Sequence, residues 1–177
     1  IGSQTIVVKR YNIKNRRHAL RRCLRPSRAV VSWKNAHRLL FLGIRTPRPI
    51  AVIEERWGIF RRRVYFIMAY LPGETIDKIV RAKIDDSRAI GNFLDHLATL
   101  INQLASAQIS HGDFKATNFL ISSNQLHLLD LDGMTAHRIN GAFKRAFRKD
   151  LVRLRLNWPD LPNISSRIAK LTDRLSM

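Results

Sequence analysis

The sequence predicts an α+β fold, in which a small antiparallel sheet with one helix is followed by a mostly helical part. Three observations support this fold class. Strand-like runs rich in β-branched residues lie mainly before residue 71, the longest helical periodicity covers residues 85–108, and two further amphipathic stretches follow residue 140. With 177 residues and 45% hydrophobic content, the chain can form a substantial core. We expect a single domain over residues 1–177, because no linker is long enough to divide it.

The first expected elements are a strand and a helix. Thr5 to Lys9 is a β-branched run that ends in a lysine. Residues 27–42 form the expected helix, with Ser27 as its N-cap and Gly43 at the C′ position. The expected apolar side of this helix consists of Ala29, Val30, Trp33, Ala36, His37 and Leu40.

Two paired strands are expected next, over residues 50–53 and 64–69, after an extended segment with Pro47 and Pro49. The intervening residues 54–63 form a polar tip, in which Trp57 and Phe60 lie among four arginines. This composition fits either a membrane or sugar-phosphate contact or an ordinary exposed hairpin tip.

The rest of the chain is predicted to be mainly helical. Residues 85–108 carry apolar side chains at a 3.6-residue period over four turns, with acidic residues at the start. A second helical face recurs from Phe143 to Leu154, and Ile164, Ile168 and Leu171 indicate a last helix.

Polar residues with a distinctive spacing follow the long helix. The chain reads His111-Gly112-Asp113-Phe-Lys-Ala-Thr-Asn118, and Asp130 follows two short apolar runs joined by a polar turn. We expect the runs at residues 118–121 and 126–129 to form a hairpin. Folding of that hairpin would bring Asn118 and Asp130 side by side at one end.

This spacing fits the needs of phosphoryl transfer. One carboxylate can hold the attacking hydroxyl, while an amide and a second carboxylate supply the oxygen ligands that Mg²⁺ prefers. The same residues would also fit a loop in which Asp and Asn cap turns. Cysteine-based metal sites are excluded, because Cys23 is the only cysteine in the sequence. A single cysteine also fits a reducing compartment.

The motif and its upstream elements resemble the protein-kinase-like superfamily, and within it the bacterial lipopolysaccharide core kinases of the Kdo/WaaP family. The helix segment from Ser27 to Asn35 is similar to that family's Ser-Arg-Ala-x-x-Glu-Trp-x-Asn, but Ser32 stands where the glutamate is expected. The resemblance implies a two-lobed fold, with residues 1–71 as the N-lobe and residues 72–177 as the C-lobe. It also implies a glycine-rich loop before Thr5. Only Gly2 is present there, so that loop is expected to be either truncated away or absent.

The resemblance implies a role for each candidate site residue, with ATP and Mg²⁺ as cofactors. Asp113 would orient the acceptor hydroxyl, and Lys115 would neutralise charge on the γ-phosphoryl group. Asp132 would contact the metal through water or cap the turn, and Asp150 would support the catalytic loop. The other implied roles are metal binding by Asn118 and Asp130, contact of Lys9 with the α- and β-phosphates, and nucleotide binding by Val7, Met68, Ala69 and Leu71.

The charge of the chain bears on its partners. The formal net charge is +19, and residues 1–49 contain no Asp or Glu. Such a surface attracts polyanions, including phosphorylated glycolipids and anionic membranes. Nucleic acid is disfavoured, because the sequence lacks aromatic stacking motifs, helix-turn-helix patterns and zinc-finger spacing. Basic composition without any dedicated partner is the remaining interpretation.

The expected function is therefore ATP-dependent phosphorylation of an inner-core sugar, Kdo or heptose, at the cytoplasmic face of the inner membrane of a Gram-negative bacterium. Gly112 favours a small-molecule or sugar acceptor, because regulated protein kinases usually carry arginine at that position. Two alternatives stay open. One is an atypical protein or small-molecule kinase, and the other is a catalytically impaired kinase-like binding module, which the serine at position 32 motivates.

Overall fold

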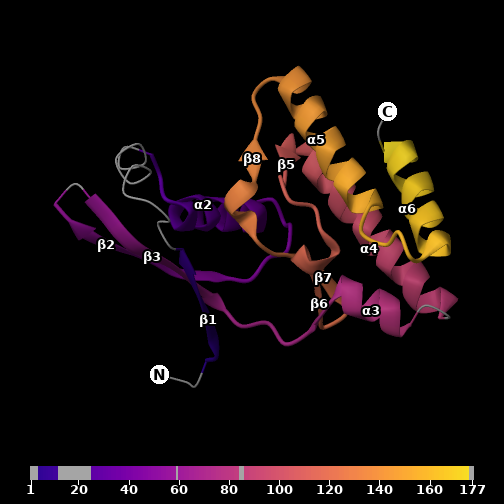
Figure 1. Ribbon diagram of the computed structural model, residues 1–177, viewed down its shortest axis with the longest axis horizontal. Helices are drawn as coiled ribbons and strands as arrows, with labels where there is room; N and C mark the ends of the chain where they lie inside the picture. Colours follow the sequence, from indigo (N-terminus) through magenta and orange to yellow (C-terminus); the bar gives the residue numbers. More distant parts are fainter. Residues whose placement is uncertain (1–3, 12–24, 59, 84–85, 176–177) are drawn as a thin grey trace. The chain divides into compact units, whose positions relative to one another are not determined.

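The structure is a computed structural model that describes residues 4–11, 25–58, 60–83 and 86–175. It divides into two compact units, Ile1–Leu71 and Pro72–Met177, here called the N-terminal unit and the C-terminal unit. Among these described residues, the N-terminal unit contains an antiparallel sheet and a helix, and the C-terminal unit contains four helices with short strands (Figure 1). The predicted α+β fold class is confirmed.

The sheet of the N-terminal unit has the order β1-β3-β2, with strands β1 (Ile6–Tyr11), β2 (Pro49–Trp57) and β3 (Phe60–Ala69). The predicted hairpin is present, but the expected polar tip over residues 54–63 is wrong. Glu54 pairs with Val64 and Trp57 pairs with Phe60, so both strands continue through the charged segment. Glu54 forms ion pairs of 2.6 Å with Arg56 and 3.3 Å with Arg61, which lets the strands carry these charges.

Helix α2 (Arg28–Phe41) lies across one face of this sheet (Figure 1). Its N-cap is as predicted, because the Ser27 hydroxyl accepts a hydrogen bond of 3.1 Å from the Val30 N–H. Gly43 follows the helix with a φ of +72°, the left-handed conformation predicted for the C′ position.

The predicted apolar side of α2 is only partly correct. The helix buries Ala29, Ser32, Asn35, Ala36 and Leu39. His37 and Leu40 are exposed instead, and Trp33 is half-buried. The buried side therefore combines the fully buried Leu39 with small and polar side chains, and it lies about one position earlier on the helix than the predicted side.

The C-terminal unit is built around α4 (Ser87–Ser106), the predicted long helix. Asp86 caps it by accepting hydrogen bonds from the N–H groups of Arg88 and Ala89. Its buried side consists of Ile90, Phe93, Leu97, Leu100, Ile101 and Leu104. The predicted helices near the C-terminus are α5 (Asn140–Arg155) and α6 (Pro162–Leu175), which pack together, and α6 also packs on α4 (Figure 1).

The expected hairpin between residues 118 and 129 is present as β6 (Phe119–Ser122) and β7 (Gln125–Leu128). Its two-residue turn consists of Ser123 and Asn124, both with positive φ, as tight hairpin turns require. Further short elements were not predicted. They are helix α3 (Ile76–Ala82), strands β4 (Glu74–Thr75), β5 (Ile109–Ser110) and β8 (Thr135–Ala136), and the 3-10 turns η1 (Ala116–Asn118) and η2 (Leu131–Gly133).

Within the described part of the chain, none of the helices combines the length and the hydropathy needed to span a bilayer.

Candidate functional site

The loop from His111 to Asn118 is fixed by a buried carboxylate on α5. Asp150 accepts hydrogen bonds from the N–H groups of His111, at 2.6 Å, and Gly112, at 2.9 Å. Burial raises the pKa of Asp150 above its ordinary value, and the two N–H donors only partly oppose this effect. The predicted supporting role of Asp150 therefore agrees with its contacts.

His111 connects this loop to the end of β7. Its ring is fully buried, and Nε2 lies 2.9 Å from the carbonyl oxygen of Leu129, which can only accept a hydrogen bond. Nδ1 in turn accepts a hydrogen bond of 3.3 Å from the N–H of Asp113. In these two contacts Nε2 carries the ring proton and Nδ1 is the acceptor. His111 thus holds the loop beside the residue that precedes Asp130.

Gly112 has a backbone reason for being glycine. Its φ is +84°, a conformation that residues with a side chain rarely adopt. A Cβ atom at this position would lie 2.7 Å from the carbonyl oxygen of Gly133. The loop and the η2 turn therefore approach each other too closely for any larger residue.

Asp113 is the centre of a polar cluster. Its Oδ2 lies 3.0 Å from the ammonium of Lys115, and its Oδ1 accepts a hydrogen bond of 2.5 Å from Arg153. The amide of Asn118 donates to the Asp113 carbonyl at 2.8 Å and to its carboxylate at 3.3 Å. Burial alone would raise the pKa of Asp113, but Lys115, Arg153 and Asn118 outweigh it and lower this pKa. The carboxylate is ionised at neutral pH.

The hairpin holds Asn118 and the residue before Asp130 together. The Asn118 carbonyl accepts a hydrogen bond of 2.8 Å from the N–H of Leu129. Because the Asn118 side-chain nitrogen donates to Asp113, its Oδ1 atom is the one that can act as a ligand. Asp130 then has a φ of +56°, a left-handed conformation that is uncommon outside glycine and typical of constrained sites.

The donor set at this end of the hairpin suits a hard cation. Asn118, Asp130 and Asp132 offer amide and carboxylate oxygens, which are the ligands Mg²⁺ prefers. Across the described ranges, no group of three or more His, Cys, Asp or Glu side chains could hold a metal ion. A transition-metal centre built from such a group is therefore not found there.

Two residues that sequence reasoning missed also hold this loop. Arg153 lies three positions after Asp150 on α5, and its guanidinium reaches Asp113. Asn157, just after α5, accepts a hydrogen bond of 2.9 Å from the Ala116 N–H. Arg153 lies within the Asp-Leu-Val-Arg-Leu run at residues 150–154, but that pattern indicated a role for Asp150 alone, and Asn157 lies outside it.

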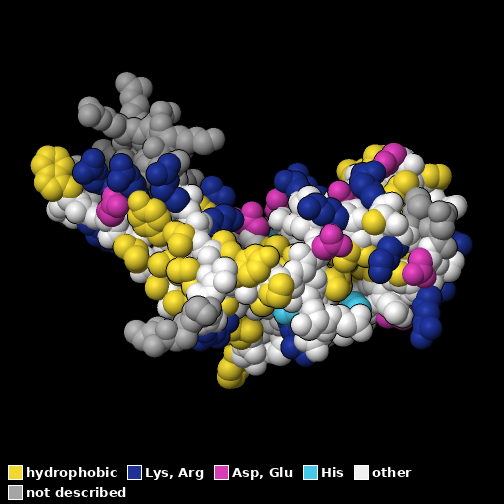
Figure 2. Space-filling view, turned by 90° about the horizontal axis from the view of Figure 1, so that it is seen from below, with side chains coloured by type: hydrophobic (Ala, Val, Ile, Leu, Met, Phe, Trp, Pro, Cys, Tyr) yellow, Lys and Arg dark blue, Asp and Glu magenta, His cyan; other side chains and the backbone are white. Residues whose placement is uncertain are grey.

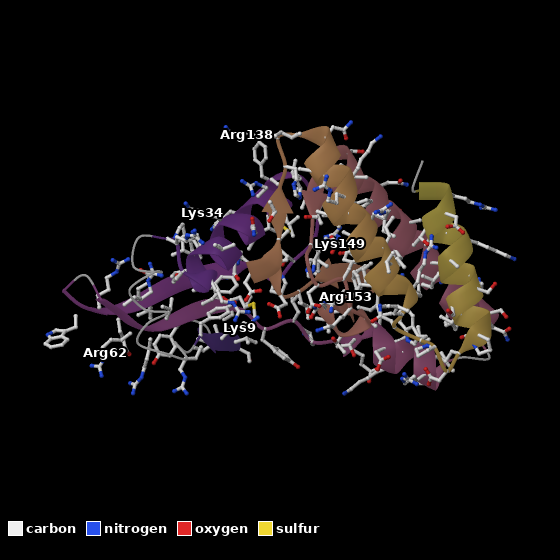
Figure 3. The ribbon with its side chains drawn as sticks, turned by 45° about the horizontal axis from the view of Figure 1, so that its top comes forward. Lys9, Lys34, Arg62, Arg138, Lys149 and Arg153 are labelled. Carbon is white, nitrogen blue, oxygen red and sulfur yellow. The ribbon has the colours of Figure 1, made fainter. Side chains whose placement is uncertain are left out.

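In the N-terminal unit, three of the candidate nucleotide residues, Val7, Lys9 and Met68, share one face of the sheet. Val7 and Lys9 are two positions apart on β1, so their side chains point to the same face. They pair with Met68 and Phe66 of β3, respectively. Lys9 is labelled in Figure 3. Its ammonium lies 5.2 Å from the centre of the ring of Tyr11, a residue that sequence reasoning missed. Tyr11 follows Lys9 by two positions, and this spacing places both side chains on the same face of the strand.

The expected hinge residues lie at the end of β3. The Ala69 N–H already donates a hydrogen bond of 2.9 Å to the Arg48 carbonyl, so the carbonyl of Ala69 is the group that it can offer to a ligand. Met68 and Leu71 are half-buried. Backbone recognition of an adenine by this segment stays a prediction.

Comparison with known proteins places these features in a family. A sequence profile described as "Lipopolysaccharide kinase (Kdo/WaaP) family" matches residues 3–170. The fold is similar to a solved structure titled "WaaP in complex with acyl carrier protein", with a TM-score of 0.64 and 18% sequence identity. That match covers 82% of this chain and 66% of the other, so the chain spans slightly less than two thirds of its length. A comparison with curated protein sequences gives no significant match.

Proposed function

Since the chain belongs to the lipopolysaccharide kinase (Kdo/WaaP) family and has its kinase-like fold, we propose that it transfers the γ-phosphoryl group of ATP to a hydroxyl of an inner-core sugar, Kdo or heptose. The observation that carries this proposal is the Asp113 cluster, in which one ionised carboxylate is held by Lys115, Asn118 and Arg153. The two compact units are proposed to be the lobes of one kinase domain.

Asp113 would accept a hydrogen bond from the acceptor hydroxyl and so direct its oxygen at the phosphorus. A lowered pKa makes Asp113 a weak base, which suits a loose transition state that requires the proton to move late. As the hydroxyl oxygen bonds to phosphorus and the bond to the ADP oxygen breaks, the proton passes to Asp113. Lys115 would offset the negative charge of the transferred group.

Lys9 would contact the α- and β-phosphates, with Val7 and Met68 beside the adenine ring. The carbonyl of Ala69 and the backbone of Leu71 would pair with the adenine edge. Support for this part comes from the shared face of Val7, Lys9 and Met68 in the β1–β3 pair.

Mg²⁺ fits the donor set of the β6–β7 hairpin. Oδ1 of Asn118 and the carboxylate of Asp130 would hold the ion, with Asp132 beside them. Bound there, Mg²⁺ would neutralise charge on the nucleotide phosphates.

The charge distribution supports an anionic acceptor. Residues 1–71 contain 17 of the 32 Lys and Arg residues but only two of the 13 Asp and Glu residues. A phosphorylated core sugar of a membrane glycolipid has the complementary charge. The same excess favours peripheral contact with an anionic membrane, which we propose to be the inner face of the inner membrane.

The proposed membrane contact is the face of the sheet that α2 does not cover, here called the outer face. Ile6 and Val8 of β1 and Ile53 of β2 lie on it and are 47%, 51% and 50% exposed. In Figure 2, hydrophobic side chains on this face adjoin a group of Lys and Arg side chains. Exposed apolar residues bordered by cations are typical of surfaces that bind the membrane interface.

Vesicle sedimentation tests the membrane contact. The chain should bind vesicles of phosphatidylcholine with phosphatidylglycerol, bind pure phosphatidylcholine weakly, and lose about tenfold in binding with Val8→Asp. Val152→Asp is the matched control, because Val152 is 50% exposed but lies on α5. Equal losses for the two variants would refute the assignment of this face.

Phosphate transfer from γ-labelled ATP tests the activity. Purified chain with Mg²⁺ should label dephosphorylated core lipopolysaccharide and leave casein unlabelled, and Asp113→Asn should reduce the rate by at least about 100-fold. Labelling of casein alone would favour the protein-kinase alternative. Binding of core lipid without transfer to either acceptor would favour a non-catalytic module.

A further inference from the structure

The Tyr11 side chain occupies a fixed position between the sheet and α2. Its backbone is paired with Val64 of β3, and its hydroxyl forms a hydrogen bond of 3.1 Å with the Ser32 hydroxyl on α2. Tyr11 is 8% exposed and Ser32 is 1% exposed, so this bond is shielded from water. The ring is therefore anchored at both ends and forms a rigid surface.

Two cations lie against that surface. The Lys9 ammonium is 5.2 Å from the ring centre, and the guanidinium carbon of Arg28 is 5.1 Å from it. Both distances fall within the range in which the negative face of an aromatic ring attracts a cation. Arg28 is the first residue of α2, so the ring gathers one cation from the sheet and one from the helix.

We propose that Tyr11 is the positioning residue for Lys9, and that the Tyr11–Ser32 pair performs on this side of the sheet the task expected of a helix glutamate. An aromatic ring attracts the ammonium without neutralising its formal charge. The contact with Tyr11 itself therefore removes none of the Lys9 charge, and Arg28 adds to the positive potential. This inference rests on the proposed nucleotide role of Lys9.

Nucleotide affinity tests the inference, measured by calorimetry with a non-hydrolysable ATP analogue and Mg²⁺. Lys9→Ala should weaken binding at least about tenfold, Tyr11→Leu about fivefold, and Tyr11→Phe, which keeps the ring, less than about twofold. Because Tyr11 acts through Lys9, the Lys9→Ala, Tyr11→Leu double variant should bind as weakly as Lys9→Ala alone.

Tyr65→Leu is the matched control for the loss of a tyrosine from the same sheet. Tyr65 pairs with Arg10 on the opposite face, and its hydroxyl donates to Glu55 at 3.3 Å. The Tyr65→Leu variant should keep its nucleotide affinity within about twofold of that of the unsubstituted chain. If Tyr11→Leu binds as tightly as the unsubstituted chain, or if its effect adds fully to that of Lys9→Ala, the positioning role is refuted.

NMR gives a readout that needs neither nucleotide nor turnover. The ε-methylene protons of Lys9, identified by their loss in Lys9→Ala, should be shifted upfield by the ring current in the original chain and in Tyr11→Phe, and not in Tyr11→Leu. An ordinary shift in the original chain would refute the ring contact. Unchanged nucleotide binding by Lys9→Ala would instead refute the proposed role of Lys9 and with it the functional part of this inference.

Discussion

The guanidinium of Arg153 donates a hydrogen bond of 2.5 Å to Oδ1 of Asp113, although the two residues are 40 positions apart in sequence. Oδ2 of the same carboxylate lies 3.0 Å from the Lys115 ammonium. Each oxygen of Asp113 therefore has its own cation, one from the loop and one from α5. This arrangement limits rotation of the carboxylate. A group that must direct a hydroxyl needs such a fixed orientation.

Arg153→Gln should lower turnover by about tenfold, because Asp113 loses one of the groups that fix its orientation. The change in the free energy of unfolding should stay below about 1 kcal/mol, since the ion pair is substantially exposed. Arg155→Gln is the matched control, because Arg155 lies on the same helix and pairs with Asp173. Steady-state kinetics and urea unfolding give both quantities, and similar turnover in the two variants would contradict the prediction.

Lys115→Met should raise the pKa of Asp113. Burial favours a higher pKa, and Lys115 is the first of the groups that oppose it, so its removal shifts the balance upwards. A carbon-detected NMR titration of Asp113 should show protonation at a higher pH than in the original chain. Asp160, whose pKa is lowered by Arg81, is the internal control and should titrate unchanged. An unmoved Asp113 would mean that Lys115 does not set its ionisation.

Asp150→Ala should destabilise the C-terminal unit by about 2–5 kcal/mol, because the buried N–H of His111 and the partly buried N–H of Gly112 lose their acceptor. Asp150→Asn keeps one acceptor oxygen and should cost less. Chemical unfolding measures both variants. A loss below about 1 kcal/mol for Asp150→Ala would show that water replaces the carboxylate.

The raised pKa of Asp150 also fixes the sign of a pH effect. The folded state binds this proton more tightly than the unfolded chain does, so the contribution of Asp150 to stability is complete below its ordinary pKa of 3.8. That contribution is lost as the pH rises through the folded pKa. Asp150→Asn should remove this part of the pH dependence of unfolding.

Gly112→Ala should cost about 2–3 kcal/mol and displace the loop, because alanine at a φ of +84° is strained and its Cβ meets the Gly133 carbonyl. Gly91→Ala is the control. Gly91 lies inside α4, and a Cβ atom added there would meet no atom of another element within 4 Å, so alanine should stabilise the chain by about 0.5–1 kcal/mol. Thermal unfolding of the two variants should therefore shift in opposite directions.

Elements with a repeating apolar pattern or a clear turn could be predicted from the sequence, and the two-residue strands could not. Helix α4 repeats its apolar pattern over several turns, whereas β4, β5 and β8 have two residues each and carry no period. The predicted buried side of α2 was partly wrong because it was placed about one position too far along the helix. Ala29 and Ala36 are buried as predicted, but Ser32 and Leu39, and not His37 and Leu40, complete the buried side.

The candidate site could be predicted where its residues are near in sequence. His111 to Asn118 and the hairpin after it bring the motif together locally, so spacing alone indicated the cluster. Arg153 and Asn157 join it only through the packing of α5, which no local pattern encodes. Tyr11 was missed because a carboxylate, and not an aromatic face, is the partner expected for a lysine such as Lys9.

The two-residue turn of the β6–β7 hairpin also affects how the site assembles. Ser123 and Asn124 close the hairpin across a very short loop, and such hairpins form within about 1–10 μs, well before distant segments dock. The segment that carries Asn118 and Asp130 should therefore acquire its register early in refolding. Attachment of Asp113 to Arg153 depends on α5 and comes later, so refolding should yield a paired hairpin before it yields a competent loop.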